Sequence, residues 1–386
     1  MTRVGNKPTS IDVVLTGADV LRPDGFAKGD LAVAGGVITS GEMGGKCVDL
    51  SGYRILPGIV DLHGDGFEHH LAPRRGVMKD LREGLYAVDA ELAANGVTTA
   101  VLAQFFSWEG GMRSPDFAER MVEALDDADG LRTDMKVQLR LEINLLDEYE
   151  RALALIHKAG IGYVVFNDHL PHEALAKGKR PPRLTGQALK SGRSPEAHHE
   201  YLKSLHAKST EVSARLSAFA AELSQSGVLI GSHDDATATD REIYRTMNAR
   251  ISEFPETVEA AQAARDGGDR IVLGSPNAVR GGSHKGNASV RDLVARGLCD
   301  ALASDYHYPS LRQAALLLAE DIGFEAAWNL VSSGPADILG LTDRGRLHSG
   351  LRADFVVMDD RNQIAATFCG GVPSWMAGDV AARFIG

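Results

Sequence analysis

Residues 55–70, ILPGIVDLHGDGFEHH, decide the fold. An apolar run ends abruptly in a series of potential metal ligands: Asp61, His63, Asp65, Glu68, His69 and His70. His63 and Asp65 are two residues apart, so both side chains point to the same side of an extended strand. A buried strand that ends in such ligands is typical of a barrel, whose strands deliver side chains into one shared mouth. The alternative is a polar loop with solvated histidines.

The composition excludes several classes of protein. A chain of 386 residues, 44% hydrophobic and 24% charged, is long enough for one large domain with a small companion. Its net charge of −11 argues against a nucleic-acid binder whose whole surface is basic. The three cysteines are far apart and odd in number, which favours neither disulfides nor a zinc knuckle. No signal-peptide pattern and no apolar stretch of about 18 residues occurs, so we expect a cytoplasmic protein without a membrane partner.

Strand-like and helical stretches alternate through the middle of the chain. Eight apolar runs are predicted as strands: 59–63, 98–103, 137–142, 163–167, 228–232, 251–254, 271–275 and 301–304. Helices are predicted between them, among others at 79–94, 116–127, 199–226 and 310–318. This alternation predicts a (β/α)8 TIM barrel, for which about 250 residues are typical. The run at 251–254, ISEF, is the weakest of the eight.

Both ends of the chain are rich in β-branched residues, alternating patterns and glycine turns. We therefore expect residues 1–56 and 346–386 to form one small β-sandwich domain. The barrel, residues 57–345, would be inserted between them.

Five of the predicted strands end in an imidazole or a carboxylate. These residues are His63, Asp65, Glu142, Asp168, His169, His233, Asp234, Asp235 and Asp305. A single residue of this kind is usually a helix cap or a satisfied loop group. Several carboxylates in one barrel mouth would repel one another unless cations held them. Imidazoles and carboxylates suit zinc, and a bridging carboxylate joins two ions about 3.5–4 Å apart, so the pattern predicts a pair of divalent metals.

These motifs resemble a known family. PGIVDLHGD (57–65), two single histidines and a late aspartate, between β-rich ends, are similar to the amidohydrolase superfamily. The usual first motif of that superfamily is His-x-His, whereas this chain has His63-Gly64-Asp65. That departure, with SHDDAT (232–237), RGGSH (280–284) and SDYHYPS (304–310), resembles the α-D-ribose 1-methylphosphonate 5-triphosphate diphosphatases of the carbon–phosphorus lyase pathway.

The resemblance implies a set of roles. His63, Asp65 and Asp305 would hold one metal, His169 and His233 the second, and Glu142 would bridge the two. Asp305 would also accept a proton from the attacking water, with His307 as the alternative acceptor. Asp65 supplies an oxygen ligand, which is harder than the nitrogen of the usual histidine. Manganese and magnesium are therefore alternatives to zinc at this site.

Three further aspartates, Asp168, Asp234 and Asp235, are expected to contact the ligand imidazoles and orient them without binding the metals themselves. An equally open alternative for Asp235 is that it caps a helix starting near Ala236.

Two basic segments point to an anionic substrate. The segment 170–193 contains six basic residues against one acid, and 275–289 is rich in glycine and follows the seventh strand. Barrels often bind phosphate through loops after strands seven and eight. The residues expected to bind substrate are Lys179, Arg180, Arg183, Arg280, His284 and Lys285. A solvated basic surface loop is the alternative.

Together these features predict hydrolysis of a phosphorylated small molecule by metal-activated water. The resemblance implies that the substrate is the ribosyl triphosphate and that the products are its 5-phosphate and pyrophosphate. Two alternatives stay open: hydrolysis at carbon of an N-acyl, cyclic amide or amino-purine substrate, and a non-catalytic scaffold. A homodimer is compatible with the sequence.

Overall fold

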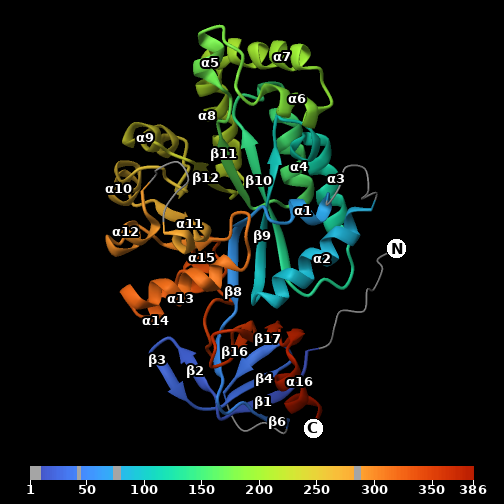
Figure 1. Ribbon diagram of the computed structural model, residues 1–386, viewed down its shortest axis with the longest axis vertical. Helices are drawn as coiled ribbons and strands as arrows, with labels where there is room; N and C mark the ends of the chain where they lie inside the picture. Colours follow the sequence, from blue (N-terminus) through green and yellow to red (C-terminus); the bar gives the residue numbers. More distant parts are fainter. Residues whose placement is uncertain (1–9, 41–44, 73–79, 282–287) are drawn as a thin grey trace. The chain divides into compact units, whose positions relative to one another are not determined.

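The computed structural model describes residues 10–40, 45–72, 80–281 and 288–386 (Figure 1). Contacts along the chain divide it into two compact units. Unit 1 contains Met1–Leu102, Asp127–Lys136 and Leu273–Gly386, and unit 2 contains Ala103–Asp126 and Val137–Val272. The predicted boundaries of the small domain and the barrel stay a prediction. Among the described residues, no helix is long and apolar enough to cross a membrane.

Eight strands form one sheet in sequence order. They are β8 (Ile59–Gly64), β9 (Val97–Phe106), β10 (Asp134–Glu142), β11 (Tyr163–Asn167), β12 (Leu229–His233), β13 (Ile251–Glu253), β14 (Arg270–Gly274) and β15 (Ala301–Ala303). A parallel bridge between Gly64 and Asp305 links the first strand of this sheet to the residues after the last. The prediction of a (β/α)8 barrel is confirmed, and all eight predicted runs form strands, including the weak ISEF run.

Helices follow the strands, as a parallel sheet requires. They include α2 (Leu81–Ala94), α3 (Pro115–Asp126), α4 (Tyr149–Ala159), α9 (Ala238–Thr246), α10 (Val258–Asp266), α11 (Ser275–Arg280), α12 (Val290–Ala295) and α13 (Ser310–Ile322). Helix α2 begins later than predicted because Asp80 is its N-cap and accepts a hydrogen bond from the Arg82 amide.

The connection after β11 is longer than the others and contains four helices. They are α5 (His172–Ala176), α6 (Leu184–Ser191), α7 (Pro195–Ala207) and α8 (Ser209–Gln225). Figure 1 shows α5, α6 and α7 beyond the end of β11, and both α5 and α6 pack against α7. The helical stretch predicted at 199–226 is helical in the structure, where Lys208 divides it into α7 and α8.

Two sheets from the chain ends make a sandwich within unit 1. One has the order β5-β4-β1-β6 and the other β18-β17-β16-β7-β2-β3. Their strands are β1 (Val13–Thr16), β2 (Asp19–Arg22), β3 (Gly25–Lys28), β4 (Leu31–Ala34), β5 (Val37–Thr39), β6 (Lys46–Asp49), β7 (Arg54–Pro57), β16 (Phe355–Met358), β17 (Ile364–Cys369) and β18 (Val372–Met376). Leu15 and Val33 of the first sheet share one apolar core with Ile55, Phe355 and Phe368 of the second. Both chain ends therefore contribute to the predicted β-sandwich.

Candidate metal centre

In unit 1, backbone hydrogen bonds bring three predicted ligands together. His63 lies fully buried on β8. The amide of Asp65 donates to the carbonyl of Asp305 (2.7 Å), and the amide of Asp305 donates to the carbonyl of His63 (3.1 Å). Asp305 has φ +53°, a conformation that aspartate tolerates better than most residues. The ends of the first and last barrel strands are thus tied at the three ligand positions.

A buried aspartate that the sequence analysis did not assign supports this strand end. Asp61 accepts hydrogen bonds from the Ser304 amide (3.0 Å) and the Ser304 hydroxyl (2.6 Å). Burial raises the pKa of Asp61 above its ordinary value, against the opposing effect of these hydrogen bonds. A side chain on Gly64 would lie 2.6 Å from Asp61 Oδ2 and 2.8 Å from Ser304 Oγ, which explains the glycine of the His-Gly-Asp motif.

In unit 2, Glu142 and His169 are in direct contact. Glu142 ends β10 fully buried, and its carboxylate accepts from Trp108 Nε1 (3.0 Å) and from the His169 amide (3.1 Å). The same carboxylate contacts His169 Nδ1. Burial lowers the pKa of His169, but the bond to Glu142 outweighs that effect, so the pKa is raised. The structure therefore brings the predicted bridging acid and one predicted histidine together.

His233, the other predicted ligand of unit 2, ends β12. Its ring centroid lies 6.4 Å from that of His169. Asp234 Oδ2 is 3.2 Å from His233 Nδ1, and the orienting role of Asp234 stays a prediction. On the other side of the ring, Nη2 of Arg140 lies 3.0 Å from Nε2.

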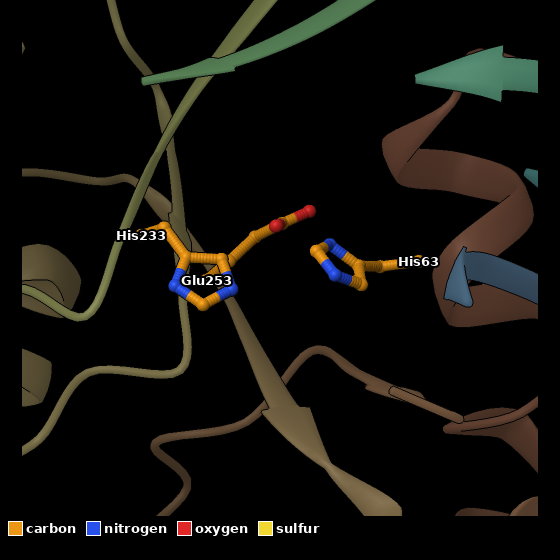
Figure 2. A group of neighbouring side chains, drawn as sticks. All are labelled: His63, His233 and Glu253. Atoms are coloured by element: carbon orange, nitrogen blue, oxygen red, sulfur yellow. The ribbon is translucent and has the colours of Figure 1, made fainter. Parts of the chain in front are cut away.

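Glu253 is a buried carboxylate that the sequence analysis missed. It lies on β13 as the register partner of His233, and Figure 2 shows both side chains and also that of His63 on β8. Its Oε1 accepts hydrogen bonds from Gln138 Nε2 (2.8 Å) and from the Tyr163 hydroxyl (2.6 Å). Burial, with Glu253 nearby, raises the pKa of Tyr163 far above its usual range. In the sequence, Glu253 could have been recognised as a carboxylate near the end of the weakest predicted strand, ISEF (251–254).

The other two aspartates contact groups other than the ligand imidazoles. Asp168 accepts from Asn144 Nδ2 (2.8 Å) and lies 3.2 Å from His172 Nε2. Asp235 is buried and accepts from Arg241 Nη1 (2.9 Å) and from the hydroxyls of Ser232 (2.7 Å) and Ser252 (2.8 Å). An orienting role for either residue stays a prediction.

The alternative that Asp235 caps a helix is wrong. Helix α9 begins at Ala238, and its N-cap is Thr237, which forms a reciprocal capping box with Asp240.

The predicted substrate-binding residues lie in different surroundings. Lys179, Arg180 and Arg183 are exposed, and Arg180 Nη2 lies 3.1 Å from Glu196. Arg280 lies over the Tyr306 ring, 5.2 Å from its centroid. His284 and Lys285 fall outside the described residues. Their role in substrate binding stays a prediction.

His69 and His70, from the stretch that decides the fold, form a separate group with Glu91 of α2. Glu91 Oε2 lies 2.5 Å from His70 Nε2 and 3.6 Å from His69 Nε2.

The six predicted ligands suit divalent metals chemically. They offer three imidazoles and three carboxylates, the donors that zinc, manganese and related ions take in proteins. Hydrogen bonds within the protein already position several predicted ligands. In unit 1 the main chains of Asp65 and Asp305 are bonded to each other, and in unit 2 the His169 amide is bonded to the Glu142 carboxylate.

Comparison with known proteins identifies the family. No family model matches the chain. The α-D-ribose 1-methylphosphonate 5-triphosphate diphosphatase of Escherichia coli (strain K12) is 31% identical over 326 residues, which cover 81% of this chain and 85% of that enzyme. The allantoinase of Bacillus velezensis is 25% identical over 404 residues, covering 90% of this chain and 85% of that protein.

Solved structures share the fold at low identity. The N-acetylglucosamine-6-phosphate deacetylase from Pasteurella multocida superimposes with a TM-score of 0.61 at 11% identity, over 95% of this chain and 100% of that one. The chain belongs to the amidohydrolase superfamily and, within it, to the family of the α-D-ribose 1-methylphosphonate 5-triphosphate diphosphatases.

Proposed function

We propose that this protein hydrolyses α-D-ribose 1-methylphosphonate 5-triphosphate to the 5-phosphate and pyrophosphate. The observation that carries the proposal is the similarity to the Escherichia coli diphosphatase over more than four fifths of both chains. The imidazoles and carboxylates at the ends of β8, β10, β11 and β12, together with Asp305 after β15, support it. Carboxyl ends of parallel barrel strands share one face, which is where barrel enzymes hold their catalytic groups.

The proposed centre has two sets of ligands. His63, Asp65 and Asp305 would hold one divalent ion, His169 and His233 the other, and Glu142 would bridge them. When bound, such a pair of ions lowers the pKa of a shared water and neutralises charge on phosphoryl oxygens. Zinc fits this donor set best, and the oxygen of Asp65 keeps manganese and magnesium as alternatives.

The residues of the chain would then position the reactants and move protons. A carboxylate oxygen of Asp305 would accept the proton of the attacking water. The indole of Trp108 holds Glu142 at 3.0 Å, which fixes the bridging carboxylate against rotation. Basic side chains would stabilise the departing pyrophosphate, because that group carries the developing negative charge.

Hydrolysis at carbon is the second candidate. The similarity to an allantoinase over 90% of this chain favours it. A homodimer and a cytoplasmic location also stay predictions.

The experiment that separates the two candidates measures which bond breaks. Purified protein is incubated in parallel with the ribosyl phosphonate triphosphate and with allantoin or N-acyl amino acids. We expect pyrophosphate release from the triphosphate and no ring opening or amine release from the amides. Amide hydrolysis without pyrophosphate release would refute the proposal in favour of the second candidate.

A further inference from the structure

Two adjacent histidines of unit 1 turn toward one carboxylate. His69 and His70 belong to α1 (Glu68–Leu71), which packs against α2, the helix that carries Glu91 (Figure 1). Glu91 Oε2 lies 2.5 Å from His70 Nε2 and 3.6 Å from His69 Nε2. One ligand atom from each of the three residues lies within 4.8 Å of the other two. The three side chains can therefore coordinate a single ion.

The two imidazoles are closer together than their places in the chain require. Neighbouring residues of a helix point about 100° apart and normally do not face each other. The ring centroids of His69 and His70 are nevertheless only 4.0 Å apart, with an angle of 40° between the ring planes. Two protonated imidazoles at this distance would repel each other. The arrangement thus favours the neutral form of at least one imidazole, and the neutral form is the one that binds metals.

The distances suit a small divalent ion. Zinc bonds of 2.0–2.2 Å in a tetrahedral site place neighbouring donor atoms roughly 3.3 Å apart. The 3.6 Å between His69 and Glu91 is close to that value, and the bond between His70 and Glu91 would lengthen by about 0.8 Å as both atoms turned to the metal. The His69 side chain is 59% exposed, so an ion can enter from solvent and water can complete its coordination.

Packing that does not involve the three side chains holds the two helices together. Leu71 of α1 is only 1% exposed. A Cβ on Gly84 of α2 would lie 2.7 Å from Leu71 Cδ2 and 2.8 Å from the carbonyl oxygen of His70, so the close approach of the helices needs glycine there. The ligand atoms are therefore brought together by the fold, which lowers the cost of ordering them around an ion.

We infer that His69, His70 and Glu91 bind one divalent ion of the zinc type, in addition to the pair proposed at the strand ends. The inference does not depend on which bond the protein hydrolyses. Two imidazoles and one carboxylate suit zinc, whereas magnesium prefers a set of oxygen ligands. With three protein ligands at a partly exposed position, this site fills when zinc is added and is empty in protein purified without it.

The test measures how much zinc the metal-loaded protein takes up. Purified protein is dialysed against buffers with increasing free zinc, and its metal content is measured by mass spectrometry. We expect the parent to gain about one zinc ion per chain over the purified state, as a single three-ligand site requires. His70→Ala and Glu91→Gln should not gain this ion. Magnesium at the same concentrations should not supply it in the parent.

Controls separate this site from other metal binding. His348→Ala removes an exposed histidine of the same unit and should gain zinc as the parent does. Combining His70→Ala with Glu142→Ala tests independence, because losses at two separate sites add. The double variant should hold one ion fewer in added zinc than Glu142→Ala alone. Glu91→Gln keeps the shape of the side chain, so its effect reports the lost carboxylate and not a change of packing.

Zinc uptake equal to that of the parent in both His70→Ala and Glu91→Gln would overturn the inference, and so would a parent that gains no zinc. The cluster would then be a hydrogen-bonded pair with a neighbouring histidine. An equal loss in His348→Ala would also overturn it, by assigning the uptake to scattered surface histidines. If circular dichroism shows that His70→Ala does not fold, His69→Ala at the exposed position takes its place.

Discussion

The backbone amide of Asp65 donates a 2.7 Å hydrogen bond to the carbonyl of Asp305, although the two residues are 240 positions apart in the sequence. This bond joins the end of the first barrel strand to the residues after the last one. Because it uses only main-chain atoms, the side chains of both aspartates can be replaced without removing it. Ligand function and fold can therefore be tested separately at these positions.

Replacing Asp305 by asparagine should abolish most turnover and preserve the fold. Asparagine tolerates the positive φ of Asp305 and keeps one oxygen donor, but it cannot accept the proton of the attacking water. We expect turnover to fall by about a hundredfold or more, within the range for loss of a general base, while the thermal melting curve is unchanged. Near-parental turnover with bound metal would assign the proton transfer to another group, such as His307.

Replacing Gly64 by alanine should destabilise the protein. The added Cβ would lie 2.6 Å from Asp61 Oδ2 and 2.8 Å from both Ser304 Oγ and Tyr308 Cε1, in a fully packed site. Overpacking of this kind costs about 1–3 kcal/mol of unfolding free energy, measured by urea denaturation. Gly162→Ala is the matched control, because no atom lies within 4 Å of its Cβ position. Equal stability of the two variants would contradict the packing described around Gly64.

Replacing Glu142 by alanine should lower the metal content of the purified protein. We expect close to two divalent ions per chain in the parent and at least one fewer in the variant, by mass-spectrometric metal analysis. Glu123→Ala removes an exposed carboxylate of the same unit, paired with Lys158, and should leave the metal content unchanged. Parental metal content in Glu142→Ala would remove Glu142 from the ligand set.

Asp354 should make the stability of the protein depend on pH. Burial raises the pKa of Asp354 to about 6, although the guanidinium of Arg352 and the Gly370 amide act against the increase. Between the unfolded value of about 4 and about 6, the folded state binds more protons, so stability falls as the pH rises. Asp354→Asn should remove this contribution, about 2–3 kcal/mol in urea unfolding at pH 4 against pH 7.

The control for this pH dependence is Asp360→Asn, which replaces an exposed aspartate nearby. It should keep the parental difference between the two pH values. An unchanged difference in Asp354→Asn would show that Asp354 is not the group responsible.

The sequence predicted the barrel strands for a physical reason, whereas the ligand residues stay a prediction. Each strand is a short apolar run, and five of the eight are followed by an imidazole or a carboxylate, as Val60 and His63 show. Local pattern alone carries that information. It does not carry the pairing of distant strands, so the contact of Arg140 with His233 and the register of Glu253 opposite His233 could not be read from it.

For the basic segment after β11, the sequence predicts the charge but not the contacts of its side chains. Its charge is plain in the sequence, but the pairing of Arg180 with Glu196 of α7 depends on how the helices fold back on one another. Similarly, the break at Lys208 lies within a continuous helical pattern, and only the structure divides it into α7 and α8. Composition therefore predicts an anionic substrate, but it does not identify the residues that would contact it.

A phosphorus NMR time course with α-D-ribose 1-methylphosphonate 5-triphosphate tests the central claim most directly. The parent and Asp305→Asn are compared at equal metal content. We predict that the parent converts the triphosphate signals into those of pyrophosphate and a sugar 5-phosphate in equal amounts, and that the variant does so about a hundredfold more slowly or less. Triphosphate signals that persist unchanged with the metal-loaded parent, or release of orthophosphate in place of pyrophosphate, would contradict the account.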